Sequence, residues 1–196
     1  MSLDSEIERY RTMLLNATGL IDDNAIADFV RQAFSAADPQ FFTSAMSSSG
    51  KYHPTEDNGR GGCARHCLKV GRIAHDLSSF YEITKQERDI VTAAGLLHDI
   101  CKNGNPWTDK TQYEHGLIAY DYLGEFTLAE PYKELIRSAV RYHLGKWAMP
   151  ESEKPRAENP TRTELVVQLA DFIGSRKSIS FLPGLELSQD AIQSYK

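Results

Sequence analysis

The spacing of hydrophobic residues predicts helices along most of the chain. Leu3, Ile7, Tyr10 and Leu14 recur at helical intervals and predict a helix over residues 3–17. The same kind of spacing predicts helices over residues 22–34 and 62–81. No segment alternates between apolar and polar residues with the period of two that marks a half-buried strand. The pattern therefore predicts an all-α fold.

Residue patterns typical of helix N-termini predict further helices after residue 81. Capping-box patterns, in which threonine is followed three residues later by glutamate, stand at residues 84–87, 111–114 and 161–164. Pro131 is expected at the first position of a helix that ends near Gly145. Serine, glycine and proline interrupt residues 35–62, which predicts a long irregular loop. Residues 178–196 are expected to form a C-terminal loop with a short final helical turn.

Length and charge limit the classes of function. The chain has 196 residues, which suits one domain over residues 1–196. A formal net charge of −5 argues against a surface that coats nucleic acid, whereas a small anionic substrate remains compatible if a metal inverts the local field. No stretch reaches the ~20 apolar residues of a membrane span. The acidic N-terminus is unlike a secretory signal, and the three cysteines are odd in number, which together favour the cytoplasm.

Histidines and aspartates occupy inward positions on several of the predicted helices. One imidazole on an apolar helix face is usually part of the core, but four such cases favour a common partner. An ionised carboxylate among apolar residues likewise needs a cation or strong donors. Neutral imidazole and carboxylate are ligands of divalent transition metals. The candidate ligands are His66, His98, Asp99, His115, His143 and Asp171.

The adjacency of His98 and Asp99 allows the two to reach one ion, because neighbours on a helix project about 100° apart. One metal ion is expected between His66, His98, Asp99 and Asp171. Since a carboxylate has two oxygens, Asp99 could bridge to a second ion. That second ion would add His115 and His143. Paired ions with open positions generate hydroxide at neutral pH and clamp a phosphoryl group.

The order of these residues resembles the HD-domain metal-dependent phosphohydrolase superfamily, in its dinuclear variant. The resemblance covers about residues 51–177. Its motifs are Gly61-Gly62-Cys63-Ala64-Arg65-His66, His98-Asp99-Ile100-Cys101-Lys102, Tyr142-His143-Leu144-Gly145 and Ala170-Asp171-Phe172-Ile173-Gly174. It implies a helical bundle of roughly 7–9 helices, with a metal-binding core at 51–177 and a helical extension at 1–34.

The resemblance also implies a function. It predicts two divalent ions, with Fe or Mn preferred over Mg, Ni, Co or Zn. The expected reaction is hydrolysis of a nucleotide or another small phosphate ester by attack of metal-bound hydroxide on phosphorus. Two alternatives stay open: a dinuclear-iron oxygenase, because the inositol-oxygenase branch has a similar ligand order, and a metal-bound regulatory module without turnover.

Basic residues near the ligands are candidate substrate contacts. Lys102 lies three residues after Asp99, on the same side of the helix. We predict that His98, Asp99 and Lys102 are catalytic and that Lys102 also binds the substrate. The alternative for Lys102 is a solvated charge at a helix end. Arg60 stands among glycines before a helix N-terminus, where anions bind readily. Arg176 follows the last ligand. For two further histidines, His53 is expected on a surface loop near the mouth of the site and His75 is expected to be exposed.

Overall fold

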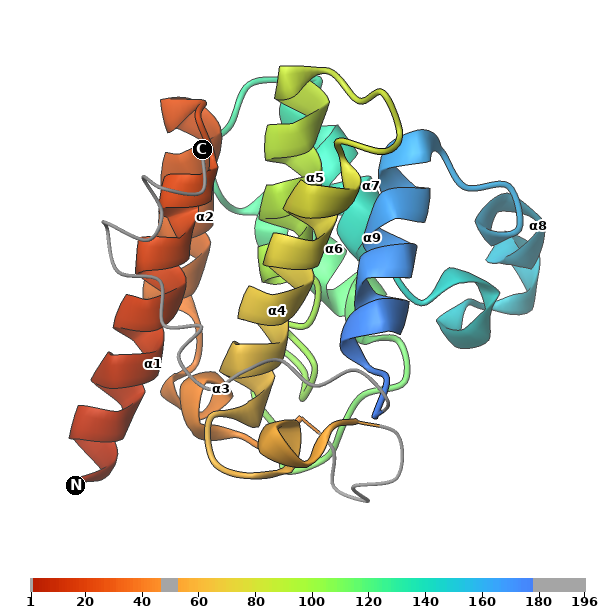
Figure 1. The fold of residues 1–196 in the computed structure, drawn as a ribbon. Helices are drawn as coiled ribbons and strands as arrows, with labels where there is room; N and C mark the ends of the chain where they lie inside the picture. The colour runs from red at the N-terminus through yellow and green to blue at the C-terminus, as the bar shows by residue number, and fades with distance from the viewer. Residues whose placement is uncertain (1, 47–52, 178–196) are drawn as a thin grey trace.

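The computed structural model describes residues 2–46 and 53–177, which form nine α-helices and no strand, confirming the all-α prediction (Figure 1). The helices are α1 (Leu3–Ala17), α2 (Asn24–Ala36), α3 (Pro39–Thr43), α4 (Gly62–Leu77), α5 (Lys85–Leu97), α6 (His115–Gly124), α7 (Tyr132–Arg141), α8 (Lys154–Ala157) and α9 (Arg162–Gly174). Short 3₁₀ helices are η1 (Thr18–Leu20), η2 (Thr55–Asn58), η3 (Gly145–Ala148) and η4 (Glu151–Glu153). None of the described helices is both long and apolar enough to cross a membrane.

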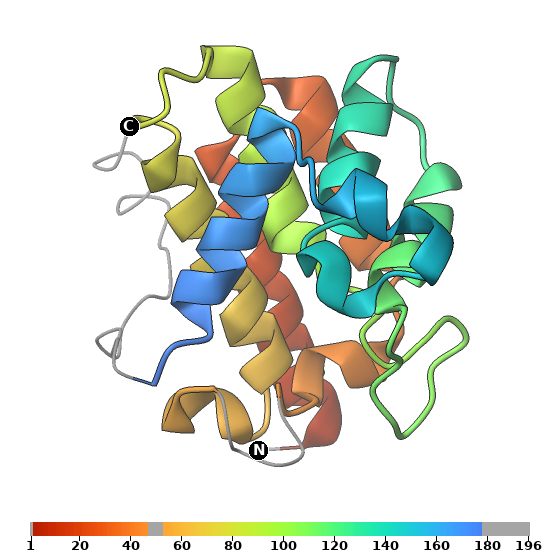
Figure 2. The same ribbon diagram turned by 90° about the vertical axis from the view of Figure 1, so that its right-hand side faces the viewer.

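The helices that carry the candidate ligands pack against one another. α4 contacts both α5 and α9, and α5 also contacts α7, which in turn pairs with α6. α1, α2 and α3 cover the other side of α4 and α5 (Figure 1). Figure 2 shows the segment with η3, η4 and α8 lying beside α9. The arrangement brings polar residues from distant parts of the sequence to the interior of one bundle.

The first helices share the hydrophobic core of the later ones. Phe29 and Phe34 of α2 are fully buried, as is Phe41 of α3. The hydroxyl of Tyr122 in α6 donates to the carbonyl of Ala33 at 2.7 Å, which ties α2 to the second half of the chain. Residues of α1 to α7 and of α9 form one continuous cluster of buried hydrophobic side chains, whereas Ala157 of α8 belongs to a smaller one. The division into an extension and a core stays a prediction.

Glycines let α4 and α5 approach closely. A Cβ atom on Gly95 of α5 would lie 3.0 Å from the Cα of Gly71 in α4. A Cβ on Gly71 would lie 2.6 Å from the Leu96 side chain. The backbones are therefore nearly in contact, and this contact sets the spacing between the helices that hold His66 and His98.

Two predicted boundaries were wrong in the first half of the chain. α4 ends at Leu77 instead of near residue 81, before a turn in which Glu82 has a φ of 50°. The supposedly irregular residues 35–62 contain α3 and η2. α3 forms because the Asp38 side chain accepts from the Gln40 amide and Pro39 occupies the first turn.

The capping-box predictions were confirmed twice and wrong once, and Pro131 is the N-cap of α7 instead of its first residue. The capping boxes at residues 84–87 and 161–164 are both present. The box at 111–114 is absent, because the Gln112 amide donates to the carbonyl of Lys102 at 2.8 Å and α6 begins only at His115. α7 ends at Arg141, so His143 lies in the turn that follows it. The predicted final turn falls outside the described residues.

Candidate metal centre

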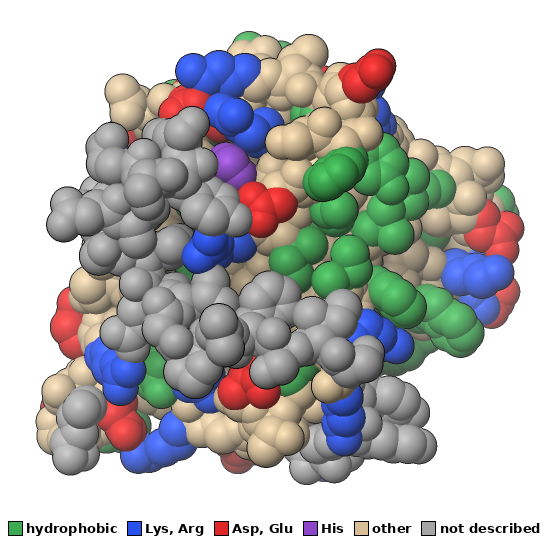
Figure 3. All heavy atoms as spheres, in the orientation of Figure 1, with side chains coloured by type: hydrophobic (Ala, Val, Ile, Leu, Met, Phe, Trp, Pro, Cys, Tyr) green, Lys and Arg blue, Asp and Glu red, His purple; other side chains and the backbone are tan. Residues whose placement is uncertain are grey.

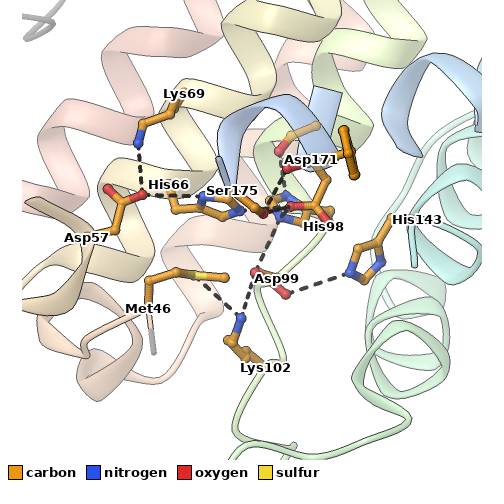
Figure 4. A network of polar contacts seen from close by, with 12 residues as sticks. Met46, Asp57, His66, Lys69, His98, Asp99, Lys102, His143, Asp171 and Ser175 are labelled. Carbon is orange, nitrogen blue, oxygen red and sulfur yellow. Dashed lines mark hydrogen bonds and ion pairs between the residues drawn. The ribbon is translucent and has the colours of Figure 1, made fainter. Parts of the chain in front are cut away.

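All six candidate ligands meet in the interior of the bundle, and Figure 4 labels every one of them except His115, which contacts Asp99 and His143. His66 projects from α4 and Asp171 from α9, while His98 caps the end of α5 and is followed by Asp99. The remaining two are His115, the first residue of α6, and His143 after α7. Each is buried, with at most 9 % of its surface exposed. The structure therefore brings together every residue that sequence analysis proposed as a ligand.

His66, His98 and Asp171 form a first group. The Nε2 atom of His66 lies 3.0 Å from Oδ1 of Asp171, and Nε2 of His98 lies 3.7 Å from the same oxygen. Their ligand atoms all lie within 4.8 Å of one another, close enough for one ion. The other nitrogen of His66 faces the carboxylate of Asp57.

Asp99 joins this group to a second one. Its Oδ2 lies 3.3 Å from Nε2 of His98, and its Oδ1 lies 2.9 Å from Nε2 of His115 and 3.7 Å from Nε2 of His143. A further set within 4.8 Å consists of His98, Asp99 and His143. The two oxygens of Asp99 thus face different histidines, the arrangement that a bridging carboxylate requires. That Asp99 bridges two ions stays a prediction.

Backbone carbonyls fix the tautomer of three of the histidines. The Nδ1 atom of His98 donates to Gly95 O at 2.8 Å, that of His115 to Gln112 O at 2.8 Å, and that of His143 to Val140 O at 2.7 Å. In the neutral form, each Nε2 therefore carries a lone pair and no proton. Histidines that bind metals are held in this way.

These lone pairs crowd one another. Nε2 of His115 lies 3.1 Å from Nε2 of His143 and 2.9 Å from a carboxylate oxygen of Asp99. Three acceptors at such distances repel unless a cation or proton lies among them. The Nε2 atom of His98 and the Oδ1 atom of Asp99 are both buried, and neither has a hydrogen-bond partner among residues 2–46 and 53–177. The residues present therefore fit a divalent transition metal, which takes nitrogen and oxygen ligands of this kind.

The protonation states of His143 and of the two aspartates suit metal binding. Burial lowers the pKa of His66 and of His98, but the carboxylates around them outweigh burial and the pKa of each is raised. Burial and the neighbouring histidines, His115 first, lower the pKa of His143 to about 3, which keeps the imidazole neutral. Burial raises the pKa of Asp171, but its hydrogen bond with His66 and the nearby charges outweigh burial and hold the pKa well below its usual range. Burial likewise opposes ionisation of Asp99, and Lys102 and His98 outweigh it. Neutral imidazoles and ionised carboxylates are the forms that bind metals.

Lys102 is part of this centre and is not a solvated helix end. Its side chain is 12 % exposed, and its Nζ donates to Oδ2 of Asp99 at 3.2 Å and to Sδ of Met46 at 3.5 Å. Burial lowers the pKa of the ammonium, but the Asp99 carboxylate more than compensates and the pKa is raised. The site therefore contains a positive charge beside the carboxylate that connects its two halves.

The two arginines lie differently. Arg176 follows α9, where its Nε donates to the carbonyl of Phe172 at 3.1 Å and its guanidinium lies 4.3 Å from the centre of the Phe172 ring. Arg60 is not brought to the ligands: its guanidinium pairs with Glu6 of α1 at 2.7 Å and is 62 % exposed. Substrate binding by either arginine stays a prediction.

Sequence analysis missed a buried pair behind His66. Asp57 of η2 is fully buried and accepts from Nζ of Lys69 at 2.8 Å (Figure 4). Nδ1 of His66 lies 3.7 Å from Oδ2 of the same carboxylate. This carboxylate is placed to orient His66 from behind, as partners of metal-bound histidines do. The only signal in the sequence was an acidic pair within a segment that lacked helical periodicity.

Both remaining histidines differ from expectation. The ring of His53 lies 5.0 Å from that of His66, so this residue is next to the centre, and burial lowers its pKa to about 4. His75 was expected to be exposed but is 8 % exposed and buried. The prediction failed because α4 is covered by α1, α3, α5 and α9, so its buried face is wider than one apolar stripe.

Comparison with known families identifies this arrangement. The model of the HD domain family matches residues 63–173, more than half of the chain. The chain belongs to the HD domain family. All six candidate ligands fall within the matched residues, and HD domains are helical and bind divalent metals. No curated protein and no solved structure matched this HD domain chain.

Proposed function

We propose that this HD domain protein is a metal-dependent phosphohydrolase that acts on a nucleotide or another small phosphate ester. The observation that carries the proposal is the convergence of unprotonated Nε2 atoms and carboxylate oxygens in one buried centre, beside the ammonium of Lys102. Membership of a family of mostly metal-dependent hydrolases supports it. We further propose small-molecule substrates, because a net charge of −5 disfavours polyanionic partners.

Each group has a role in this proposal. The four histidines and two aspartates would hold the ions, which would supply a water-derived nucleophile at neutral pH and neutralise a phosphoryl group. Lys102 would donate a hydrogen bond to a phosphate oxygen, because an ammonium has three donors and can hold Asp99 with one of them. Burial of the ligands excludes bulk water and strengthens these electrostatic contacts.

The proposal is tested with purified protein loaded with Mn²⁺ or Fe²⁺ and a panel of phosphomonoesters and phosphodiesters. We expect phosphate or nucleotide release by the wild type. Asp99→Ala should abolish it, because this residue contacts both halves of the centre. Tyr113→Ala serves as the control, since Tyr113 is 67 % exposed and its loss should leave the rate unchanged.

Three outcomes would contradict the proposal. Consumption of oxygen with an organic substrate, without phosphate release, would favour a dinuclear-iron oxygenase. Metal binding without turnover of any compound would favour a regulatory module. Phosphate release that persists in Asp99→Ala would place the chemistry elsewhere.

A further inference from the structure

A groove of about 880 Å³ leads outward from the candidate metal centre. Its inner end is lined by the ligands His143 and Asp171. One wall is α9, and the other is the segment with η3 and the end of α8. In Figure 3, hydrophobic side chains gather on the face beside α9 and the lobe with α8. The groove is within the size range of small-molecule sites, roughly 300–1,000 Å³.

Two large aromatic residues line this groove and are exposed. Trp147 of η3 is 77 % exposed, and Phe172 of α9 is 57 % exposed. Across the described ranges, only three other large hydrophobic residues are exposed, namely Leu3, Phe80 and Tyr113. Leu165 and Leu169 of α9 add apolar surface to the lining. Such an apolar lining next to polar ligands is typical of a site that binds an organic group and a polar group together.

The charged residues at the groove already have partners. Lys146 pairs with Glu158 at 3.1 Å, and the guanidinium of Arg176 lies over the Phe172 ring. These charges are therefore engaged with neighbouring groups, and the exposed rings of Trp147 and Phe172 are the main apolar surfaces that the groove offers. Planar rings gain the most from such a surface, because stacking on aromatic side chains needs no particular pattern of hydrogen bonds.

We propose that the groove binds a planar aromatic group of the substrate, joined to the phosphate that the metal centre holds, and that Trp147 and Phe172 determine this specificity. The inference rests on the proposed phosphohydrolase function, because it places the phosphate at the ligands that end the groove. Continuity between the groove and two ligands favours one substrate that spans both over a peptide or a second copy of the chain.

Ion pairs hold the outer wall in place. Arg156 of α8 donates to Glu164 of α9 at 2.5 and 3.0 Å, and Arg141 of α7 donates to Glu153 of η4 at 2.5 and 3.2 Å. Glu164 is 1 % exposed, which shields its contact with Arg156 from water. The groove is thus formed before a ligand arrives, and binding does not have to order it.

The test compares AMP with ribose 5-phosphate, which carries a hydroxyl at C1 of the ribose where AMP carries adenine. With Mn²⁺-loaded protein, we expect kcat/KM for AMP to exceed that for ribose 5-phosphate by about 5- to 150-fold, because one stacked base contributes ~1–3 kcal/mol. Trp147→Ala and Phe172→Ala should each reduce this preference, chiefly by raising KM for AMP. Phe80→Ala is the control, since Phe80 is 82 % exposed and lies outside the groove.

A second readout does not need turnover. The chain has two tryptophans, so Trp107→Phe leaves Trp147 as the only indole reporter. AMP should quench Trp147 fluorescence, whereas ribose 5-phosphate should not. Quenching without hydrolysis of either compound would support the groove and refute the proposed function. Equal hydrolysis of both compounds without quenching would support the function and overturn the groove proposal, and a loss of preference in Phe80→Ala as large as in Trp147→Ala would overturn it too.

Discussion

Replacing His143 by leucine should have opposite effects on the metal-free and metal-loaded protein. In the metal-free centre, Nε2 of His143 lies 3.1 Å from Nε2 of His115 and 3.7 Å from Oδ1 of Asp99. Leucine of similar size removes this repulsion together with the buried imidazole, and it also removes the hydrogen bond from Nδ1 to the carbonyl of Val140. Replacing buried polar groups with packed apolar ones is often neutral or stabilising, so we expect a gain of about 1 kcal/mol. For a chain of this length, that raises the melting temperature by roughly 2–4 °C.

Metal should reverse the order of stability. At a free metal concentration 100 times the Kd, binding stabilises the wild type by about 2.7 kcal/mol, or roughly 5–11 °C in melting temperature. His143→Leu removes one ligand and should lose most of this shift. Differential scanning calorimetry in EDTA and in Mn²⁺ measures both effects on the same samples.

His75→Leu is the matched control, because it replaces a buried histidine of α4 that lies outside the groups that could hold a metal. This variant should keep the full metal-induced shift whatever its own stability. A full shift in His143→Leu would refute the placement of His143 in the centre. A large loss of stability of that variant in EDTA would refute the argument that the metal-free centre is repulsive.

Three further substitutions test the surroundings of the site. Asp57→Asn should weaken metal binding about 10- to 100-fold, because it removes the charge that orients His66; chelator competition measures this, and an unchanged affinity would contradict the role. Glu164→Gln should lower the free energy of unfolding by about 1–2 kcal/mol at pH 7, since the Arg156 side chain that loses its charged partner is 41 % exposed. Burial raises the pKa of Glu164, but Arg156 outweighs burial and the pKa is lowered. The stabilisation by ionised Glu164 is therefore present above pH 4.5 and disappears as the pH falls through the pKa of the folded state. Urea titrations should show the stabilities of the wild type and the variant converging in acid. Gly95→Ala should cost about 1–3 kcal/mol, since its Cβ would lie 3.0 Å from the neighbouring helix; a melting temperature equal to the wild type would contradict the close packing.

Helical periodicity and local chemistry together located the ligands. His66 lies at a regular interval from Val70 and Ile73 on one face of α4, so helical geometry alone placed it inside. Asp171, between Ala170 and Phe172, needed a cation to be buried, and chemistry rather than spacing identified it. Both inferences used only residues that lie close together in the same helix, and the sequence shows such local relations directly.

Other features depended on contacts between distant segments. Asp57 reaches His66 because η2 packs against α4, and nothing near Asp57 in the sequence shows this. The absent capping box at residues 111–114 has the same cause, since the backbone of Gln112 binds that of Lys102. Tertiary contacts overrode local signals in both cases.

Metal stoichiometry of the purified protein tests the central claim most directly. We expect elemental analysis to find two divalent transition-metal ions per chain in the wild type. Both His98→Ala and Asp99→Ala should reduce this content, since these residues contact both halves of the centre. Wild-type protein that binds no metal after incubation with Fe²⁺ or Mn²⁺, or variants that keep the full content, would contradict the account.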